Sequence, residues 1–185
     1  MIKALISSIL VYIKNFIFCL KYPFWRSRNI WTDKPYGYSY TKYDDIPEGW
    51  RKAFGIELSE ALRKQLIKDD NLHKFRFIEI KEKWGYLCLY NNGGSEELLE
   101  LIHHYEDLSA CYCYKCGKPA RYKTIGWIEY LCDDCSKDSK RQRLTENDIP
   151  KSCLYDMTTG EIVEKKLNID YHYMWGLEEE FENSD

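Results

Sequence analysis

Two Cys-x-x-Cys pairs, separated by fifteen residues, constrain this chain more than any other feature of its sequence. Such a pair folds into a tight bend whose two thiolates face a common centre, and Gly117 lets the backbone turn around the first pair of sulfurs. The spacing between the pairs lies in the range of zinc ribbons. Between them, residues 121–124 and 127–131 suit a short hairpin with a turn near Ile125–Gly126. We therefore predict one structural Zn²⁺ ion. Its four ligands are Cys113, Cys116, Cys132 and Cys135.

The predicted metal site is closed. Four thiolates leave no coordination position for a reactive water, so the ion supports folding and not hydrolysis. A redox dithiol and an iron–sulfur cluster are the alternative uses of these cysteines, and Cys111 is an alternative first ligand to Cys113. The other cysteines, Cys19, Cys88 and Cys153, are scattered. That distribution is typical of a reducing compartment, which predicts a cytoplasmic protein.

Charge divides the 185 residues into four segments. Residues 1–43 carry seven Lys/Arg and one acid, and residues 44–110 carry nine and fourteen. Residues 111–143 carry eight Lys/Arg and four acids, whereas residues 144–185 carry three and eleven. We expect an N-terminal apolar helix with a basic aromatic segment, an α/β unit, the zinc ribbon, and a hairpin with an acidic tail, in that order.

Residues 1–22 have apolar side chains at helical spacing, and Pro23 ends the pattern. A secretory signal does not fit, because Lys14 interrupts the apolar run and no small-residue cleavage site follows. A transmembrane span would be short. An interfacial helix, with Trp25 and Trp31 at the depth of the lipid headgroups, fits better. Packing on the protein's own core, or an oligomer contact, is the competing interpretation.

The α/β unit has a clear order of elements. Apolar residues at four-residue spacing predict a helix over 50–67, and β-forming residues predict strands over 75–83 and 86–90. Ser95 is a good N-cap for a helix that ends near residue 108. The predicted fold class is α+β: a helix–strand–strand–helix unit with an appended four-cysteine ribbon and an apolar N-terminal helix.

Two features of this unit are typical of catalytic or anion sites, but both are more simply structural. His103 and His104 are adjacent, so on a helix they point about 100° apart and do not chelate one metal. The Asn91–Gly94 loop precedes a helix but lacks the Lys-Ser/Thr ending of a phosphate loop, which favours a turn. We therefore predict no enzymatic activity.

Basic and aromatic residues surround the predicted ribbon. Such a mixture can grip phosphates and stack on bases, although a zinc ion with four thiolates is itself negative and offsets part of the charge. The candidate nucleic-acid contacts are Lys115, Lys118, Arg121, Lys123, Lys140 and Arg141. Beyond the ribbon, residues 152–166 predict a hairpin, residues 169–176 are aromatic enough to dock on the body, and the acidic end is solvated.

About half of the chain, from residue 46 to residue 135, resembles a family of uncharacterised bacterial and phage or prophage proteins. The shared pieces are PEGW at Pro47–Trp50, IKEKWG at Ile80–Gly85, NNGG at Asn91–Gly94 and LSA at Leu108–Ala110, followed by CxxCGKPA and GWxxxLCDDC around the four cysteines. The ordered combination is far more specific than any one piece.

The chain departs from this family in one strand, where relatives carry a second glycine and an arginine near the positions of Tyr86 and Cys88. The family has no established activity, so the resemblance implies architecture and a bacterial or phage setting. Our functional hypothesis is a non-enzymatic zinc-binding protein that engages another protein. The alternative is a nucleic-acid-binding accessory protein, and residues 1–22 add a candidate contact with a membrane surface.

Overall fold

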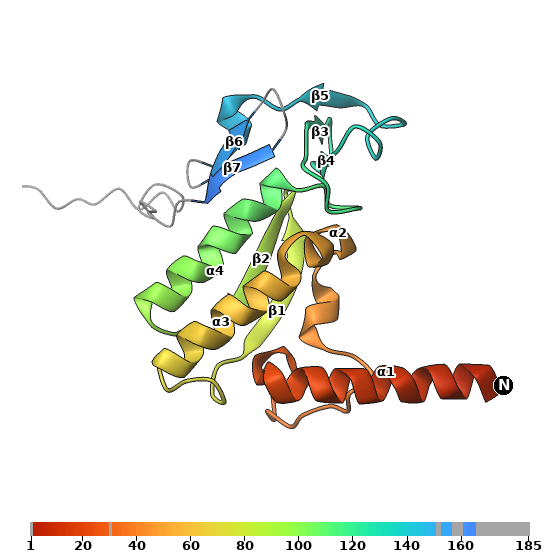
Figure 1. Cartoon of the computed structure of the whole chain (residues 1–185), viewed down its shortest axis with the longest axis vertical. Coiled ribbons are helices and arrows are strands. Elements are labelled where there is room, and N and C mark those ends of the chain that lie inside the picture. Colours follow the sequence, from red (N-terminus) through yellow and green to blue (C-terminus); the bar gives the residue numbers. More distant parts are fainter. Residues whose placement is uncertain (1, 30, 151–152, 157–160, 166–185) are drawn as a thin grey trace, which may run out of the picture.

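The computed structural model describes residues 2–29, 31–150, 153–156 and 161–165, and Figure 1 shows the arrangement of its elements. The predicted α+β class is confirmed. At its centre are α3 (Ile56–Lys68), β1 (Phe77–Lys83), β2 (Tyr86–Asn91) and α4 (Glu96–Leu108). The two strands pair antiparallel, and the two helices lie side by side against them (Figure 1). Ser95 caps α4 as predicted, because its Oγ accepts a hydrogen bond from the Leu98 amide at 3.2 Å.

The two strands are joined by a two-residue turn. Lys83 pairs with Tyr86, and the residues between them, Trp84 and Gly85, both have positive φ values of 56° and 86°. This is the backbone of the tight hairpin turns that match strand twist, and it commonly places glycine at the second position. The turn points the Trp84 side chain into solvent, where 62% of its surface is exposed.

The helix predicted over 50–67 contains an irregularity. Between α2 (Glu48–Trp50) and α3 the chain makes a π-helical turn, η3 (Arg51–Gly55). The buried residues follow at intervals of four, a spacing that drifts by about 40° per step around a regular α-helix. A wider π turn reduces that drift and keeps the early residues on the core side. The buried residues are Trp50, Phe54, Leu58, Leu62 and Leu66.

An aromatic cluster from the N-terminal segment completes the core. After α1 the chain forms a 3-10 turn, η1 (Pro23–Trp25), whose Trp25 stacks on Phe77 with ring centroids 4.7 Å apart. The Trp25 indole also donates a hydrogen bond to Ser59 Oγ at 2.9 Å and is fully buried. Placing Trp25 at a lipid headgroup is therefore wrong. Its apolar area is used inside the protein.

The N-terminal helix, α1 (Ile2–Lys21), extends away from the body (Figure 1). It is long and apolar enough to cross a membrane, and only 6% of the stretch Lys3–Lys21 is buried. Packing against the protein is confined to the second half of the helix, where Cys19 is buried, Phe18 contacts Tyr43 and Phe16 contacts Tyr38. For the rest of the helix that interpretation is wrong.

The ribbon contains one more strand than the sequence predicted. A three-stranded sheet has the order β4-β3-β5, with β3 at Tyr122–Thr124, β4 at Tyr130–Leu131 and β5 at Arg141–Arg143. The predicted hairpin supplies the first two strands. The third was missed because the chain returns only after the second cysteine pair, so its pairing is not local.

Short helical turns and a second hairpin complete the described chain. The turns are η2 (Lys42–Asp45) before the body, η4 (Ser109–Cys111) and η5 (Glu146–Asp148) around the ribbon. The strands β6 (Cys153–Asp156) and β7 (Glu161–Lys165) pair antiparallel, as predicted for 152–166. The turn predicted between them, the predicted docking of 169–176 and the acidic end lie outside the described residues.

Candidate metal centre

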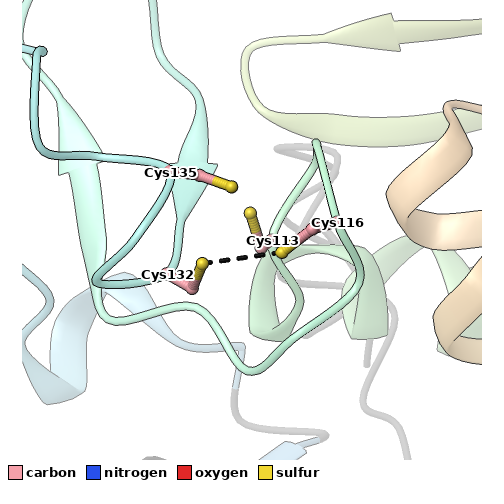
Figure 2. Close-up of side chains that lie close together, drawn as sticks. All are labelled: Cys113, Cys116, Cys132 and Cys135. Carbon is pink, nitrogen blue, oxygen red and sulfur yellow. Dashed lines mark hydrogen bonds between the residues drawn. The ribbon is translucent and has the colours of Figure 1, made fainter.

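The four predicted ligands come together in space. The sulfur atoms of Cys113, Cys116, Cys132 and Cys135 all lie within 4.8 Å of one another. Figure 2 shows that two come from each bend and that the thiols face a common point. In a tetrahedral zinc site with Zn–S bonds of about 2.3 Å the sulfurs are about 3.8 Å apart, so the cluster is close to the geometry of a bound ion.

Backbone hydrogen bonds shape the first bend. The Cys113 amide donates to the Lys118 carbonyl at 2.7 Å, and the Gly117 amide donates to the Cys113 carbonyl at 2.9 Å. Gly117 has a φ of 82°, the left-handed region that a residue without a Cβ enters at least cost. In the second bend the Ser136 amide donates to the Cys132 carbonyl at 3.1 Å.

The donor set suits a soft divalent cation. Burial raises the pKa of Cys116 and of Cys135, so bare thiolates are disfavoured at these two positions. Burial also opposes ionisation of Cys132, but hydrogen bonds from the Cys135 backbone and from the neighbouring thiols bring its pKa below the ordinary value. A cation supplies the positive charge that four crowded sulfurs need, and zinc prefers four thiolates in this arrangement.

The cysteines outside the cluster are accounted for separately. Cys111, the alternative first ligand, is fully buried in the main hydrophobic core and is not part of the four-sulfur group. None of the seven cysteines whose side chains the structure describes forms a disulfide bond. The dashed line in Figure 2 joins Cys116 and Cys132, whose sulfurs are 3.5 Å apart, far longer than a disulfide bond of about 2.05 Å.

The α+β body holds the first bend directly. The Gly49 amide donates to the carbonyl of Tyr114, between the two cysteines, at 3.1 Å. The neighbouring Trp50 indole donates to the Tyr112 carbonyl at 3.3 Å, and its ring packs edge-on against Tyr114. A Cβ on Gly49 would lie 2.2 Å from the Cys113 carbonyl oxygen, so only glycine allows this approach. The body therefore forms one wall of the metal centre.

A second contact joins the ribbon to the body and was not predicted. The β1–β2 turn meets β4, where a Cβ on Gly85 would lie 2.7 Å from the Tyr130 ring. Beside this contact Trp84 and Trp127 stack, with centroids 6.4 Å apart and planes 27° apart, and both remain more than 60% exposed. The sequence signal was a tryptophan next to a glycine in two separate turns, WG at 84–85 and GW at 126–127.

Acidic neighbours engage most of the candidate nucleic-acid contacts. Lys115 pairs with Glu129 at 3.3 Å, Lys118 with Asp134 at 2.9 Å, and Arg121 with Asp133 at 3.5 Å. Lys123 pairs with Asp148. Arg141 lies over the ring of Tyr122, 4.3 Å from its centroid, and Lys140 is exposed. These six residues form a basic rim around the ribbon. Because four of them are in ion pairs, most of the positive charge of the rim is already neutralised.

The adjacent histidines of α4 point to different surroundings. His103 Nδ1 lies 2.8 Å from Glu106 Oε2, whereas His104 is buried against the Tyr105 ring. Glu106 also accepts a hydrogen bond from the Leu89 amide at 2.6 Å. His103 and Glu106 thus join α4 to β2, at the rim of a cavity of about 340 Å³ between the two elements. The hydrogen bonds of Glu106 with His103 and with the Leu89 amide give the pair a structural role.

Comparison with protein-family models, with curated proteins and with solved structures gives no match. The fold and the site define the class of the protein on their own evidence. It is an α+β protein with small antiparallel sheets, an apolar N-terminal helix and a cluster of four cysteines compatible with zinc binding.

Proposed function

We propose that this chain is a non-enzymatic, zinc-stabilised interaction protein that binds another protein through the stacked pair Trp84 and Trp127. The observation that carries the proposal is the exposure of this pair. Two indoles are in contact, yet 62% and 69% of their surfaces face solvent. Tryptophan is the residue type most enriched at the energetic centres of protein interfaces, because it buries a large area at little conformational cost.

The metal gives this surface its rigidity. Trp127 lies between β3 and β4, and the strand β4 leads directly into the second cysteine pair. With all four sulfurs on one ion, the hairpin that presents Trp127 is held against the turn that presents Trp84. A preorganised aromatic pair binds with a smaller entropic penalty than two mobile side chains. A closed site of four thiolates serves this purpose and leaves no position for catalysis.

We propose that the protein is of bacterial or phage origin and acts in the cytoplasm. The family resemblance supports the origin, and the absence of disulfide bonds among the described cysteines supports the location. Engagement of nucleic acid receives less support, because four of the six candidate contacts already have carboxylate partners. Isolated surface charges attract phosphates more strongly than paired ones.

Trp84→Ser/Trp127→Ser tests the proposal against a control, Trp31→Ser, which removes an indole that is 87% exposed elsewhere. Each purified protein is cross-linked in an extract of bacterial cells, and the captured proteins are compared. We expect the wild type and both variants to keep one zinc and the same melting temperature, while only the double variant loses a partner. Equal capture by the wild type and the double variant, or no capture by either, would show that the pair is not the docking site.

A further inference from the structure

The apolar surface of α1 has a definite direction. Large aliphatic side chains cover a sector of about 140° at about 100° per residue, and each is between 49% and 66% exposed. The six that define the sector are Leu5, Ile6, Ile9, Leu10, Ile13 and Ile17. This area is too continuous for a helix surrounded by water, so a partner covers it.

One edge of this sector is basic. Lys3, Lys14 and Lys21 fall within about 20° of one another around the helix, directly beside Leu10. The helix contains no acidic residue. Lys21 is paired with Glu60 of α3, whereas Lys3 and Lys14 are exposed. An apolar sector bordered by lysines matches the chemistry of a membrane surface with anionic lipids.

The segment after α1 decides how the helix meets a bilayer. Asn15 Nδ2 donates to the Tyr38 carbonyl at 2.9 Å, and the Tyr38 ring packs edge-on against Tyr12 and Phe16. Arg26 lies over that ring, 4.7 Å from its centroid. The second half of α1 is therefore flanked by polar backbone and a guanidinium, which a hydrocarbon core does not accommodate.

A full span is excluded by the length that remains. Residues 2–11 precede the contacts with Tyr38, and ten helical residues measure about 15 Å, half of a hydrocarbon core of about 30 Å. The sector of aliphatic side chains lies on the side of the helix away from Asn15, so it can enter a bilayer sideways while Tyr38 stays above it. Sideways insertion keeps the hydrogen bond between Asn15 and Tyr38 out of the hydrocarbon, and the contact of Phe16 with the Tyr38 ring lies near one edge of the inserted sector.

We propose that α1 lies in the plane of an anionic membrane, with Leu5, Ile6, Ile9, Leu10, Ile13 and Ile17 in the lipid and Lys3 and Lys14 at the phosphates. A second copy of α1 is the competing occupant. It is disfavoured because two such helices bring Lys3 and Lys14 of both copies together with no acidic residue on either helix, and because a paired-helix seam is narrower than this sector. The ribbon lies at the opposite end of the β1–β2 pair from α1, so membrane binding leaves it accessible (Figure 1).

Flotation of the full chain with vesicles tests the membrane contact. We expect binding to phosphatidylcholine vesicles that contain phosphatidylglycerol and much weaker binding to phosphatidylcholine alone. Ile9→Gln/Ile13→Gln is expected to lower the partition coefficient at least about tenfold, because two buried aliphatic side chains are lost. The matched control Ser7→Gln/Ser8→Gln places the same side chains on the polar sector and leaves binding unchanged. Lys3→Gln/Lys14→Gln lowers binding to the anionic vesicles about tenfold.

Two results distinguish the alternatives. Alkaline carbonate is expected to release the bound protein, and resistance to this extraction would replace the in-plane helix by a span. Failure to float, together with a dimer in sedimentation that Ile9→Gln/Ile13→Gln abolishes, would assign the sector to a second copy. Failure to float without such a dimer would also refute the proposal. None of these measurements depends on the tryptophan pair of the ribbon, so the two proposals fail separately.

Discussion

The backbone amide of Gly49 donates a hydrogen bond to the carbonyl oxygen of Tyr114, at 3.1 Å, between the two cysteines of the first bend. Gly117, just after this bend, also approaches Gly49, since a Cβ on Gly117 would lie 2.5 Å from the Gly49 carbonyl oxygen. Two glycines thus allow direct backbone contact between the body and the metal centre. This contact makes the ribbon part of the protein's core structure.

Gly49→Ala is predicted to lower the free energy of unfolding by about 1–3 kcal/mol, because the added methyl group overlaps backbone atoms that have no room to move. Chemical denaturation measures the change. Gly37→Ala is the matched control, since its Cβ would meet a Tyr12 ring atom at an ordinary 3.4 Å and we expect a change within about 0.5 kcal/mol. Equal denaturation midpoints for the two variants would contradict the close approach.

The purified protein is predicted to contain one zinc per chain by elemental analysis. Cys132→Ser, or a strong chelator, removes the ion and lowers the free energy of unfolding by about 3 kcal/mol or more, because the ribbon depends on the metal. Cys88→Ser is the control, since Cys88 lies on β2 outside the four-sulfur group and its variant keeps the zinc. A full zinc content in Cys132→Ser would refute the ligand assignment.

Stability is predicted to depend on pH through His103. The hydrogen bond with Glu106 raises the pKa of His103 above its ordinary value. A folded-state pKa above the unfolded one stabilises the protein below the unfolded pKa of about 6.5, and the contribution disappears as pH rises through the folded value. The contribution is below about 1 kcal/mol for a partly exposed pair.

The measurement compares denaturation of the wild type and Glu106→Gln at about pH 6 and about pH 8. Glutamine keeps an oxygen that accepts from the Leu89 amide but removes the charge next to His103. We expect the wild type to lose its advantage over the variant between the two pH values. An advantage that is the same at both would contradict the assignment.

Binding to nucleic acid is predicted to be weak. With four of six rim residues paired to carboxylates, few cations are left to displace counterions from phosphates. Fluorescence anisotropy with single- and double-stranded DNA and RNA at rising salt measures this. Tight binding with a steep salt dependence, reduced by Lys140→Gln and unchanged by Trp84→Ser/Trp127→Ser, would restore nucleic acid as the principal partner.

Much of the local structure was predictable because neighbouring residues specify it. The Ser95 cap, the strands on either side of Trp84 and Gly85, and the grouping of the four cysteines each follow from a short pattern of residue types. The π turn was not predictable in this way. The turn depends on the shape of the core around Phe54, and distant segments of the chain form that core.

Two tryptophans show most clearly the difference between what the sequence predicts and what the tertiary structure decides. Trp25 and Trp31 stand six positions apart in one basic segment, yet the first is fully buried and the second is 87% exposed. Composition gives the same expectation for both, because an indole is suited equally to a core and to a surface contact. Only the approach of Phe77 and Ser59, from another part of the chain, distinguishes them.

The order of residues was sufficient to predict the four-cysteine cluster and the α+β class, since tight bends and periodic apolar residues act within a few positions. Only the tertiary structure decided three contacts: the hydrogen bond from Gly49 to the first bend, the stacking of Trp84 on Trp127, and the packing of Tyr38 against α1. These contacts join residues far apart in the chain. Their energy depends on packing that no local pattern records.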